Sequence, residues 1–445
     1  MDAMHNITVQ RERLSKWLTP GIGIKRWLLL LLIGGIGTGV GFTYAVLKLL
    51  GSGMIVNVAE AAPWSLIILL ALAGLVLVLI SLFGLTLSLL APYRRNRNDT
   101  VVDVIFSHSQ RQRGMKVVAF GGGTGLPATL RSLKKHTSNI TAIVTVADDG
   151  GSSGRLRREL GVLPPGDLRN NIVALADDEN LLTQLFQFRF QAGDLKGHSF
   201  GNLFIAAMAN VVGEPNDNKN SLAEALIEIE KVLNIQGRVL PATLDDVQLT
   251  ANIRLNNSNR MIKVMGEAQT SDVDGRIESI ALRPADVQAY PDSVKAILNA
   301  DVIVIGPGSL YTSILPNLMV KGIADALRAT RAYKIYVCNV AQQPVETVDY
   351  TVADHIIALE KHIGRGVFHA VLANSVYPSR NAGVTRYVMP AADNHEILQR
   401  YEVRYTDLCD AARPWRHDPD KLAKAILGLC QEAHISAAFT VRTAS

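Results

Sequence analysis

The sequence predicts an α/β protein with a mostly parallel, doubly wound sheet, a small inserted β subdomain, and two transmembrane helices that precede both. Three observations lead to this fold class. Two long uncharged apolar runs lie within the first 92 residues. Short apolar, β-rich runs are then followed by glycine-rich turns and helical patterns, which is typical of parallel α/β sheets. Residues 239–282 instead alternate polar and apolar side chains, as antiparallel strands do.

The composition limits the classes of protein to be considered. With 445 residues, 48% of them apolar and 19% charged, the chain can bury more than one sizeable core. The cysteines Cys338, Cys409 and Cys430 fit neither a disulfide framework nor a CxxC metal site, so we expect a reducing compartment. The net charge of +5 comes from basic residues beside the apolar runs, so we expect no nucleic-acid partner.

The two apolar runs, Trp27 to Leu47 and Pro63 to Pro92, contain no charged residue, and each exceeds the roughly 20 residues that span a bilayer. Basic clusters lie before the first run and after the second. By the positive-inside rule both ends are then cytoplasmic, which predicts a two-pass protein of the cell membrane with its main domain in the cytoplasm. A signal peptide is the alternative for the first run, but the second run and the basic cluster after it favour a retained hairpin.

These patterns divide the chain into five segments, one of which contains an insert. We expect a basic cytoplasmic N-terminus (1–26), a transmembrane hairpin (27–91), a juxtamembrane linker (92–115), a main domain (116–435) with its β insert (239–282), and a tail (436–445). Several glycines in the first apolar run would let the two helices pack closely, namely Gly34, Gly35, Gly37, Gly39 and Gly41.

The main domain opens with a strand, a glycine turn and a helix. The strand is Lys116 to Phe120, and the turn consists of Gly121, Gly122, Gly123, Thr124 and Gly125. Glycines let a backbone approach a ligand, and the free N–H groups at a helix start favour an anion such as phosphate. The spacing is neither a P-loop nor a strict GxGxxG, and a tight turn without a ligand is the alternative.

A second strand, Ile140 to Val146, ends at a cluster of polar side chains: Asp148, Asp149, Ser152, Ser153 and Arg155. Ligands of open α/β sheets bind beyond the carboxyl ends of the strands, so this loop and the glycine turn would line one crevice. The carboxylates could hold a divalent ion, bind a ribose or accept a proton, and the serines with the arginine could contact phosphate. An Asx-type turn with solvated charges is the alternative.

Two further helix starts carry polar residues. Asp167 is placed to cap one helix, with Arg169 and Asn170 in its first turn, either at a ligand or on an exposed surface. His198 and Asn202 precede an apolar helix that ends at Val212. His198 could be catalytic, although a lone histidine is more often structural.

The strand, glycine turn and helix arrangement recurs later in the chain. Residues 301–305 form the strand, and Gly306, Pro307, Gly308 and Ser309 form the turn, which predicts a second anion site. A buried strand over 333–339 then ends at Asn339, and the following loop contains Gln342, Gln343, Pro344 and Glu346, either at the ligand face or as a simple loop. No P-loop, Ser-His-Asp order or zinc-ligand spacing occurs in the sequence.

Five motifs resemble a known family when they are taken in order: VVAFGGGTGL, TVADDGGSSGRLRREL, PPGDLRNN, GHSFGNL and VIGPGSLYTSILPNL. They are similar to the gluconeogenesis-factor (YvcK) branch of the YvcK/CofD family. The resemblance covers about residues 116–430 and implies a three-layer, Rossmann-like fold. The membrane hairpin lies outside it and occurs only in some members.

The family resemblance also implies a ligand. The YvcK branch is known as a UDP-sugar-binding factor needed for normal cell shape and for growth on gluconeogenic carbon, whereas the CofD branch transfers phospholactate in making coenzyme F420. The long run that begins at Asp148 resembles the YvcK branch. Transferred to this sequence, the nucleotide site would comprise Gly121, Gly122, Gly123, Thr124, Gly125, Asp148, Asp149, Ser152, Ser153, Arg155, Asp167, Arg169, Asn170, Asn202, Gly306, Gly308, Ser309 and Asn339. The loop after Asn339 lacks the Thr and Gly that are common in this branch.

Three functional hypotheses follow. The first is a non-catalytic UDP-sugar sensor at the membrane that supports envelope synthesis and requires no cofactor. The second is a transferase or another phosphoryl-handling enzyme, in which Asp148 or Asp149 holds Mg²⁺ against a diphosphate. The third is a dinucleotide-binding protein. We expect a nucleotide-linked small molecule and the membrane as partners, and a homodimer is possible.

Overall fold

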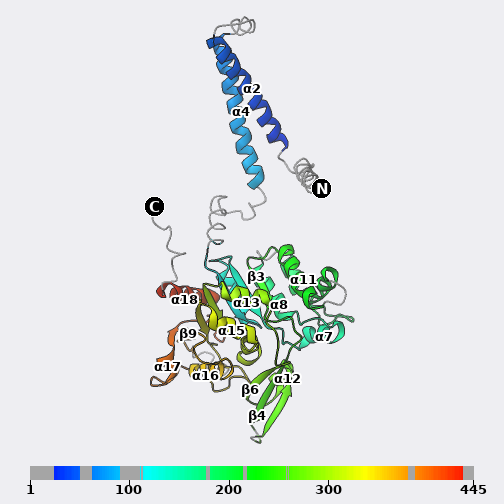
Figure 1. Ribbon diagram of the computed structural model, residues 1–445, viewed down its shortest axis with the longest axis vertical. Coiled ribbons are helices and arrows are strands. Elements are labelled where there is room, and N and C mark those ends of the chain that lie inside the picture. Colours follow the sequence, from blue (N-terminus) through cyan, green and yellow to red (C-terminus); the bar gives the residue numbers. More distant parts are fainter. Residues whose placement is uncertain are drawn as a thin grey trace. The chain divides into compact units, whose positions relative to one another are not determined.

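A computed structural model of the chain describes residues 25–50, 63–90, 111, 114–176, 181–213, 218–256, 258, 260–378 and 386–433 (Figure 1). The chain forms two compact units, residues 1–108 and residues 109–445. The expected basic N-terminus up to residue 24, most of the juxtamembrane linker and the tail lie outside the described residues.

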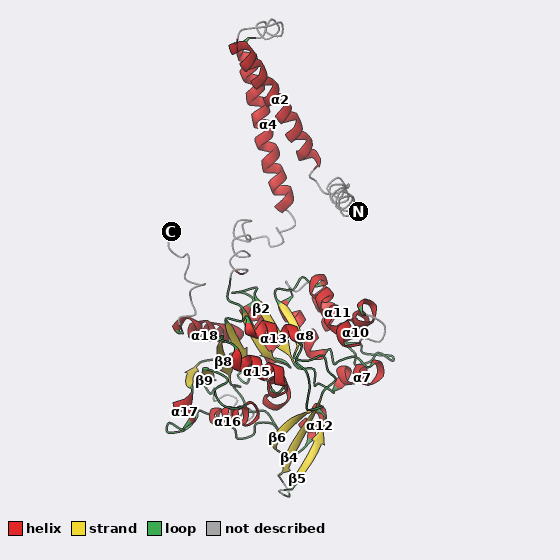
Figure 2. Ribbon diagram, in the orientation of Figure 1, coloured by secondary structure: helices red, strands yellow, loops and turns green. Residues whose placement is uncertain are grey.

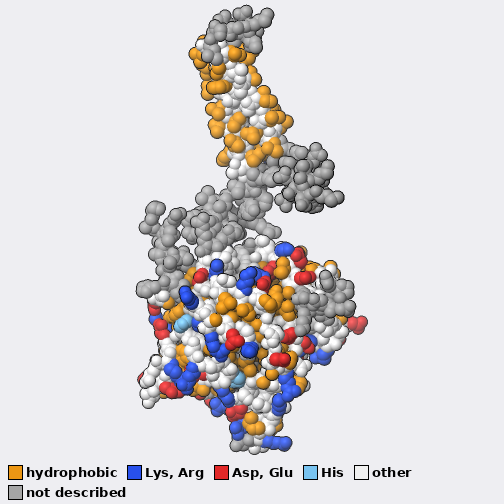
Figure 3. Space-filling model, viewed as in Figure 1, with side chains coloured by type: hydrophobic (Ala, Val, Ile, Leu, Met, Phe, Trp, Pro, Cys, Tyr) orange, Lys and Arg blue, Asp and Glu red, His pale blue; other side chains and the backbone are white. Residues whose placement is uncertain are grey.

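The first unit contains two long helices, α2 (Lys25–Leu50) and α4 (Trp64–Leu90). Both are long and apolar enough to cross a membrane, over Arg26–Leu49 and Trp64–Thr86. Figure 3 shows hydrophobic side chains along both helices, and Leu32 and Phe83 are 62% and 68% exposed. Helices with this pattern are candidate membrane spans, because lipid rather than water would suit such a surface.

The glycines of α2 differ in what they face. A Cβ added to Gly34 or Gly41 would lie 2.9 Å from backbone atoms of α4, whereas Gly35 and Gly39 have nothing within 4 Å. On α4, a Cβ on Gly74 would lie 2.4 Å from the backbone nitrogen of Thr38. Close packing of the two helices therefore requires only some of the predicted glycines, in agreement with the use of small residues at membrane-helix contacts.

The second unit is built on a seven-stranded sheet of order β10-β9-β8-β7-β1-β2-β3, in which all neighbouring strands are parallel (Figure 2). The expected α/β class is confirmed. The strands are β1 (Val117–Gly121), β2 (Ile140–Val144), β3 (Arg238–Pro241), β7 (Val302–Ile305), β8 (Tyr333–Val337), β9 (Ala370–Asn374) and β10 (Glu402–Thr406).

Helices flank this sheet. Right-handed crossovers that run in opposite directions from β1 and β7 place their helices on opposite faces. Helix α6 packs against α8 and α18, and α13 packs against α15. The helical elements are α6 (Gly125–Leu133), α7 (Gly151–Leu160), α8 (Gly166–Leu175), α9 (Leu181–Gln187), α10 (Phe200–Val212), α11 (Asn218–Val232), α13 (Pro291–Leu298), η2 (Leu310–Ile314), α14 (Leu315–Leu318), α15 (Lys321–Ala329), α16 (Val352–Ile363), α17 (Ile397–Arg400) and α18 (Pro419–Glu432).

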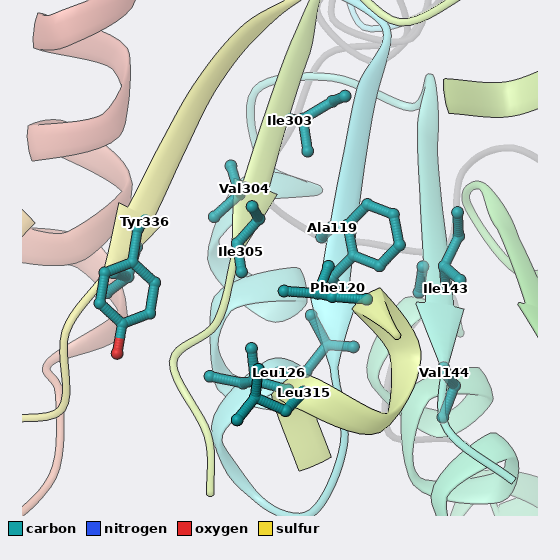
Figure 4. Packing of buried hydrophobic residues seen from close by; sticks show 14 of the residues in the cluster. Ala119, Phe120, Leu126, Ile143, Val144, Ile303, Val304, Ile305, Leu315 and Tyr336 are labelled. Carbon is teal, nitrogen blue, oxygen red and sulfur yellow. The ribbon is translucent and has the colours of Figure 1, made fainter. Parts of the chain in front are cut away.

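The core lies where the central strands are covered on both faces. All five residues of β1 and all four of β7 are buried, as expected for strands between two helical layers. Figure 4 shows Phe120 of β1 with Ile143 of β2 and Ile305 of β7, each at most 1% exposed. The continuous apolar runs in the sequence therefore correspond to the middle of the sheet.

The chain changes direction between β1 and β7. β2 and β3 extend the sheet on one side of β1, and β8, β9 and β10 extend it on the other side of β7. Phe120 pairs with Ile305, so the loops after β1 and β7 leave the same edge next to each other. This is the topological switch point, where α/β sheets of this type bind their ligands.

The β insert is a separate three-stranded antiparallel sheet of order β5-β4-β6, made of β4 (Gln248–Leu255), β5 (Met261–Met265) and β6 (Gly275–Arg283). Helix α12 (Glu267–Asp272) joins β5 to β6. The expected start at residue 239 is wrong, because β3 pairs in parallel with β2 and belongs to the main sheet. The residues of β3 from Val239 to Pro241 are all buried, as expected for a strand that is covered on both faces. The strand β4 of the insert instead contains exposed residues.

Candidate functional site

The glycine turn after β1 is confined on two sides. A Cβ on Gly122 would lie 2.4 Å from Oδ2 of Asp167, and one on Gly125 would lie 2.4 Å from the carbonyl oxygen of Pro307. Gly123 has a φ of +57°, which glycine adopts without strain. The turn therefore needs glycine because α8 and the loop after β7 both approach its backbone closely.

Asp167 does not cap its helix. Helix α8 begins one residue earlier, at Gly166, and the Asp167 carboxylate instead accepts a hydrogen bond from the backbone N–H of Gly123. Burial, and then the charge of Asp148, raise the pKa of Asp167 to about 6. The capping expectation is wrong because α8 turns this side chain toward the glycine turn.

Asp148 forms the Asx-type turn that was the alternative to ligand binding. Its Oδ1 accepts a hydrogen bond from the N–H of Gly150 at 2.8 Å, and Ser153 also donates to its carboxylate. Burial is the main cause that raises the pKa of Asp148. The Asp148 carboxyl group accepts these two hydrogen bonds and interacts with the charge of Asp167. It could still accept a hydrogen bond from a ligand hydroxyl or bind a cation.

Asp149 points elsewhere. Its Oδ1 accepts a hydrogen bond from the backbone N–H of Ala268 in α12, at 2.9 Å. A Cβ on Gly266 would lie only 2.1 Å from its Oδ2. Among the described residues, no group of three or more His, Cys, Asp or Glu side chains is arranged to hold a metal ion.

Arg169 is the buried cation of the site. It is 9% exposed and donates to Ser199, to Asn202 Oδ1 at 3.0 Å and to Asn170 Oδ1 at 2.8 Å, all of them uncharged. Its Nε is buried without a hydrogen-bond partner, and burial lowers its pKa. A buried guanidinium whose printed hydrogen bonds go to uncharged groups can still bind a ligand anion, although the charges of Asp167 and Asp148 also act on it.

His198 links two helix starts. Its Nδ1 lies 3.0 Å from Oγ of Ser152, the second residue of α7, and Nδ2 of Asn202 in α10 donates to the same oxygen at 3.1 Å. Burial is the first cause that lowers the pKa of His198. The His198 imidazole thus has a structural contact with Ser152. Two other predicted residues also join loops, since Ser153 Oγ accepts from Gly166 and Arg155 donates to the carbonyl of Lys196.

The glycine turn after β7 is held by the loop after β8. Asn339 accepts a hydrogen bond from the N–H of Gly308 at 3.2 Å and donates to its carbonyl oxygen at 2.9 Å. Gln343 donates to Oγ of Ser309 at 2.6 Å. The polar residues after β8 thus lie at the predicted edge, where they contact the second turn itself.

Glu346 fills the helix start that follows this turn. It is 6% exposed and accepts hydrogen bonds from the N–H of Tyr311 at 3.1 Å and from Oγ1 of Thr312 at 2.9 Å. These groups at the start of η2 were expected to face a ligand anion. The chain's own carboxylate occupies them, and Asp167 likewise accepts from the N–H of Gly123 in the first turn, so Arg169 is the stronger anion candidate.

Glu267 is a site residue that sequence reasoning missed. Its pKa is raised well above the ordinary value by burial first, and then by the charges of Asp148 and Asp167. These groups come from α12, from the loop after β2 and from α8. No local pattern marks Glu267, because it lies in the insert and reaches the site only through tertiary packing.

Known proteins resemble this chain in sequence and in fold. Residues 117–426 match the family model described as 2-phospho-L-lactate transferase CofD. A crystal structure of a UPF0052 family member from Bacillus halodurans has a TM-score of 0.63 and 42% identity, and the match covers 71% of this chain and 99% of that one.

Three relatives extend the match. A protein of Nostoc sp. is 45% identical over 94% of this chain and 93% of its own length. Proteins named gluconeogenesis factor from Bacillus subtilis and Halalkalibacterium halodurans are 49% and 42% identical, over 58% and 70% of this chain and 78% and 95% of their own lengths. The chain therefore belongs to the CofD family, in the branch whose members are named gluconeogenesis factor.

Proposed function

We propose that this protein binds a UDP-sugar, or a closely related nucleotide-linked metabolite, at the carboxyl edge of its parallel sheet and acts as a non-catalytic sensor. The observation that carries the proposal is the buried Arg169, whose hydrogen bonds go to neutral partners. A diphosphate would offer Arg169 charge-assisted hydrogen bonds, which its neutral partners do not. The first glycine turn, beside the start of α6, offers the backbone approach that a phosphate needs.

The carboxyl groups beside Arg169 point to a second part of the ligand. Asp148 and Asp167 would repel a phosphate if both were ionised, but they can accept hydrogen bonds from hydroxyl groups. A nucleotide sugar carries both kinds of group, a diphosphate and several hydroxyls. The mixture of one buried cation and two carboxyls therefore suits it better than it suits inorganic phosphate.

The two apolar helices suggest where this binding takes place. We propose that α2 and α4 anchor the protein in the cell membrane, with the main domain in the cytoplasm. The match to the Nostoc protein over 94% of the chain supports a shared N-terminal region, because residues 117–445 alone are too few for that coverage. Placed there, a UDP-sugar sensor would support envelope synthesis and cell shape during gluconeogenic growth.

A Mg²⁺-dependent transferase is the second candidate, and one observation favours it. The charge of Asp148 contributes to the raised pKa of Asp167, and a divalent cation between them would relieve that repulsion. Asp149, the other expected ligand of the ion, is already hydrogen-bonded to Ala268. Among the described residues no three carboxyl groups are arranged to hold an ion, so the ligand's phosphates would have to complete the site.

Calorimetry on the full chain in lipid nanodiscs separates these functions. UDP-glucose, UDP-N-acetylglucosamine, GDP and NAD are titrated separately, with Mg²⁺ or with EDTA. The sensor predicts binding of UDP-sugars in EDTA and no new product by chromatography. Binding that requires Mg²⁺, together with turnover, would establish the transferase instead, and a preference for NAD would establish the dinucleotide hypothesis.

A further inference from the structure

A side chain of the candidate site contacts the insert. Asp149, in the loop after β2, accepts a hydrogen bond from the N–H of Ala268 at 2.9 Å. Ala268 is the second residue of α12, and Gly266, which precedes the helix, has no side chain to cap it. Asp149 therefore caps α12 from a position 119 residues away in the sequence.

Gly266 is shaped for this contact. Its φ of +101° is a backbone conformation that other residues rarely adopt, and an added Cβ would lie 2.1 Å from Oδ2 of Asp149. Only glycine at this position lets the carboxylate reach the start of the helix without displacing it. The contact thus depends on one residue on each side, which makes it testable from both.

A second attachment holds the insert to the other half of the sheet. His362 in α16 accepts a hydrogen bond from the N–H of Ile280 in β6 at 3.1 Å, and Arg276 of β6 lies 5.4 Å from the ring centre of Tyr350. The hydroxyl of Tyr350 lies 2.8 Å from that of Tyr311 in η2. This end of the insert is therefore connected to the helix that follows the second glycine turn.

The two attachments lie on opposite sides of the switch point. Asp149 follows β2, which extends the sheet from β1, whereas α16 lies between β8 and β9. Figure 2 shows β4, β5, β6 and α12 together beyond one edge of the domain, next to α16. The insert thus connects both halves of the sheet at the edge where the two glycine turns meet.

We propose that Asp149 is a positioning residue that fastens the insert across this edge, so that α12 holds Glu267 at the nucleotide site and ligand binding is coupled to the insert. The proposal rests on the proposed function for its ligand. Glu267 directly precedes Ala268, so release of the helix start would displace a carboxyl group whose pKa is raised by burial and by the charges of Asp148 and Asp167.

Substitution of Asp149 tests this role, because Asn and Ala differ in whether they keep a hydrogen-bond acceptor for Ala268. Asp149→Asn loses the charge but keeps an oxygen that can accept from Ala268, whereas Asp149→Ala loses the acceptor. We expect amide hydrogen exchange over residues 266–272 of the unliganded full chain to accelerate by roughly tenfold or more in Asp149→Ala and to stay near wild type in Asp149→Asn. UDP-glucose affinity should fall in the first variant and be largely retained in the second.

Two further variants complete the experiment. Gly266→Ala should reproduce the exchange and affinity changes of Asp149→Ala, and the double variant should add little to either, because both disrupt one contact. Asp272→Ala, at an exposed carboxylate of the same helix, is the matched control and should change neither.

The outcomes separate the two proposals. If amide hydrogen exchange in Asp149→Ala equals that of the wild type, Asp149 does not fasten the insert. If exchange is faster but the affinity is unchanged, the insert is not coupled to the ligand. Loss of affinity in Asp149→Asn as large as in Asp149→Ala would mean that the charge matters, as for a Mg²⁺ ligand. If the wild-type chain binds no UDP-sugar, the proposed function fails, while amide hydrogen exchange in the unliganded protein still shows whether Asp149 fastens the insert.

Discussion

Asp167 and Gly123 are joined by a hydrogen bond from the backbone N–H of the glycine to the carboxylate, across the gap between α8 and the turn after β1. The same carboxylate has a pKa of about 6, raised chiefly by burial. An acidic group thus lies at the turn that was expected to attract a phosphate. The candidate site therefore combines carboxyl groups, which can accept hydrogen bonds, with a buried arginine.

The charge of Asp167 should make the fold less stable at neutral pH. Its carboxyl titrates at about 6 in the folded chain and near the ordinary value of 3.8 in the unfolded chain. The folded chain then binds more protons between these values, so the free energy of unfolding falls as pH rises through this window. Asp167→Asn should remove this loss and stabilise the protein by up to roughly 3 kcal/mol near pH 8 and by little near pH 4.

Thermal unfolding of both proteins across this pH range gives the measurement. Asn can still accept from Gly123, so the variant changes charge more than geometry. Asp148 and Glu267 also have raised pKa values and remain in the variant, so its own stability should still fall with pH, but less steeply. An equal stability difference at both ends of the range would contradict the assigned titration.

Arg169 should be required for binding. We expect Arg169→Met, which keeps much of the length and loses the charge, to weaken UDP-sugar affinity by roughly tenfold or more, as for loss of a charge-assisted hydrogen bond. Calorimetry measures this effect. Arg238→Met is the control, because Arg238 begins β3 at the opposite end of the strand and forms a half-exposed pair with Asp292. Equal affinities in both variants would remove Arg169 from the site.

The second glycine turn permits a clean test of backbone approach. A Cβ on Gly308 would have no neighbour nearer than 3.7 Å, so Gly308→Ala should fold normally. If a ligand reaches this backbone, the added methyl group should still weaken binding. Gly122→Ala is the contrasting variant, because its Cβ would lie 2.4 Å from Asp167, and it should lower the melting temperature as well. Normal affinity in Gly308→Ala would confine the phosphate to the first turn.

The membrane topology can be tested apart from any ligand. A reporter fused at Asn57, between the apolar runs, should be extracytoplasmic, and one fused at Ser445 should be cytoplasmic, because the basic clusters lie at the outer ends of the hairpin. Alkaline phosphatase and fluorescent-protein fusions report the two sides. The reverse arrangement, or a soluble protein cleaved after the first run, would exclude the hairpin.

Much of the fold is encoded locally and could be predicted. The strands β1 and β7 are continuous apolar runs, rich in Val and Ile in β7, and each leads into glycines and a helical pattern. Both features involve near neighbours in the chain, so a sequence displays them directly. The strand β3 was misassigned because its four residues are too few to distinguish burial on both faces from alternation.

The sequence by itself determined the class of fold, the two candidate membrane spans and the loops in which a ligand site should be sought, because these depend on local periodicity, on glycine and on runs without charge. Only the tertiary structure decided what each polar side chain faces. Asp148 and Asp149 are adjacent in the chain, yet one turns back on its own loop and the other caps α12. Glu346 and Glu267 approach the site from distant segments. Such contacts depend on how separate elements pack against one another, and the spacing of residues along the sequence does not predict this packing.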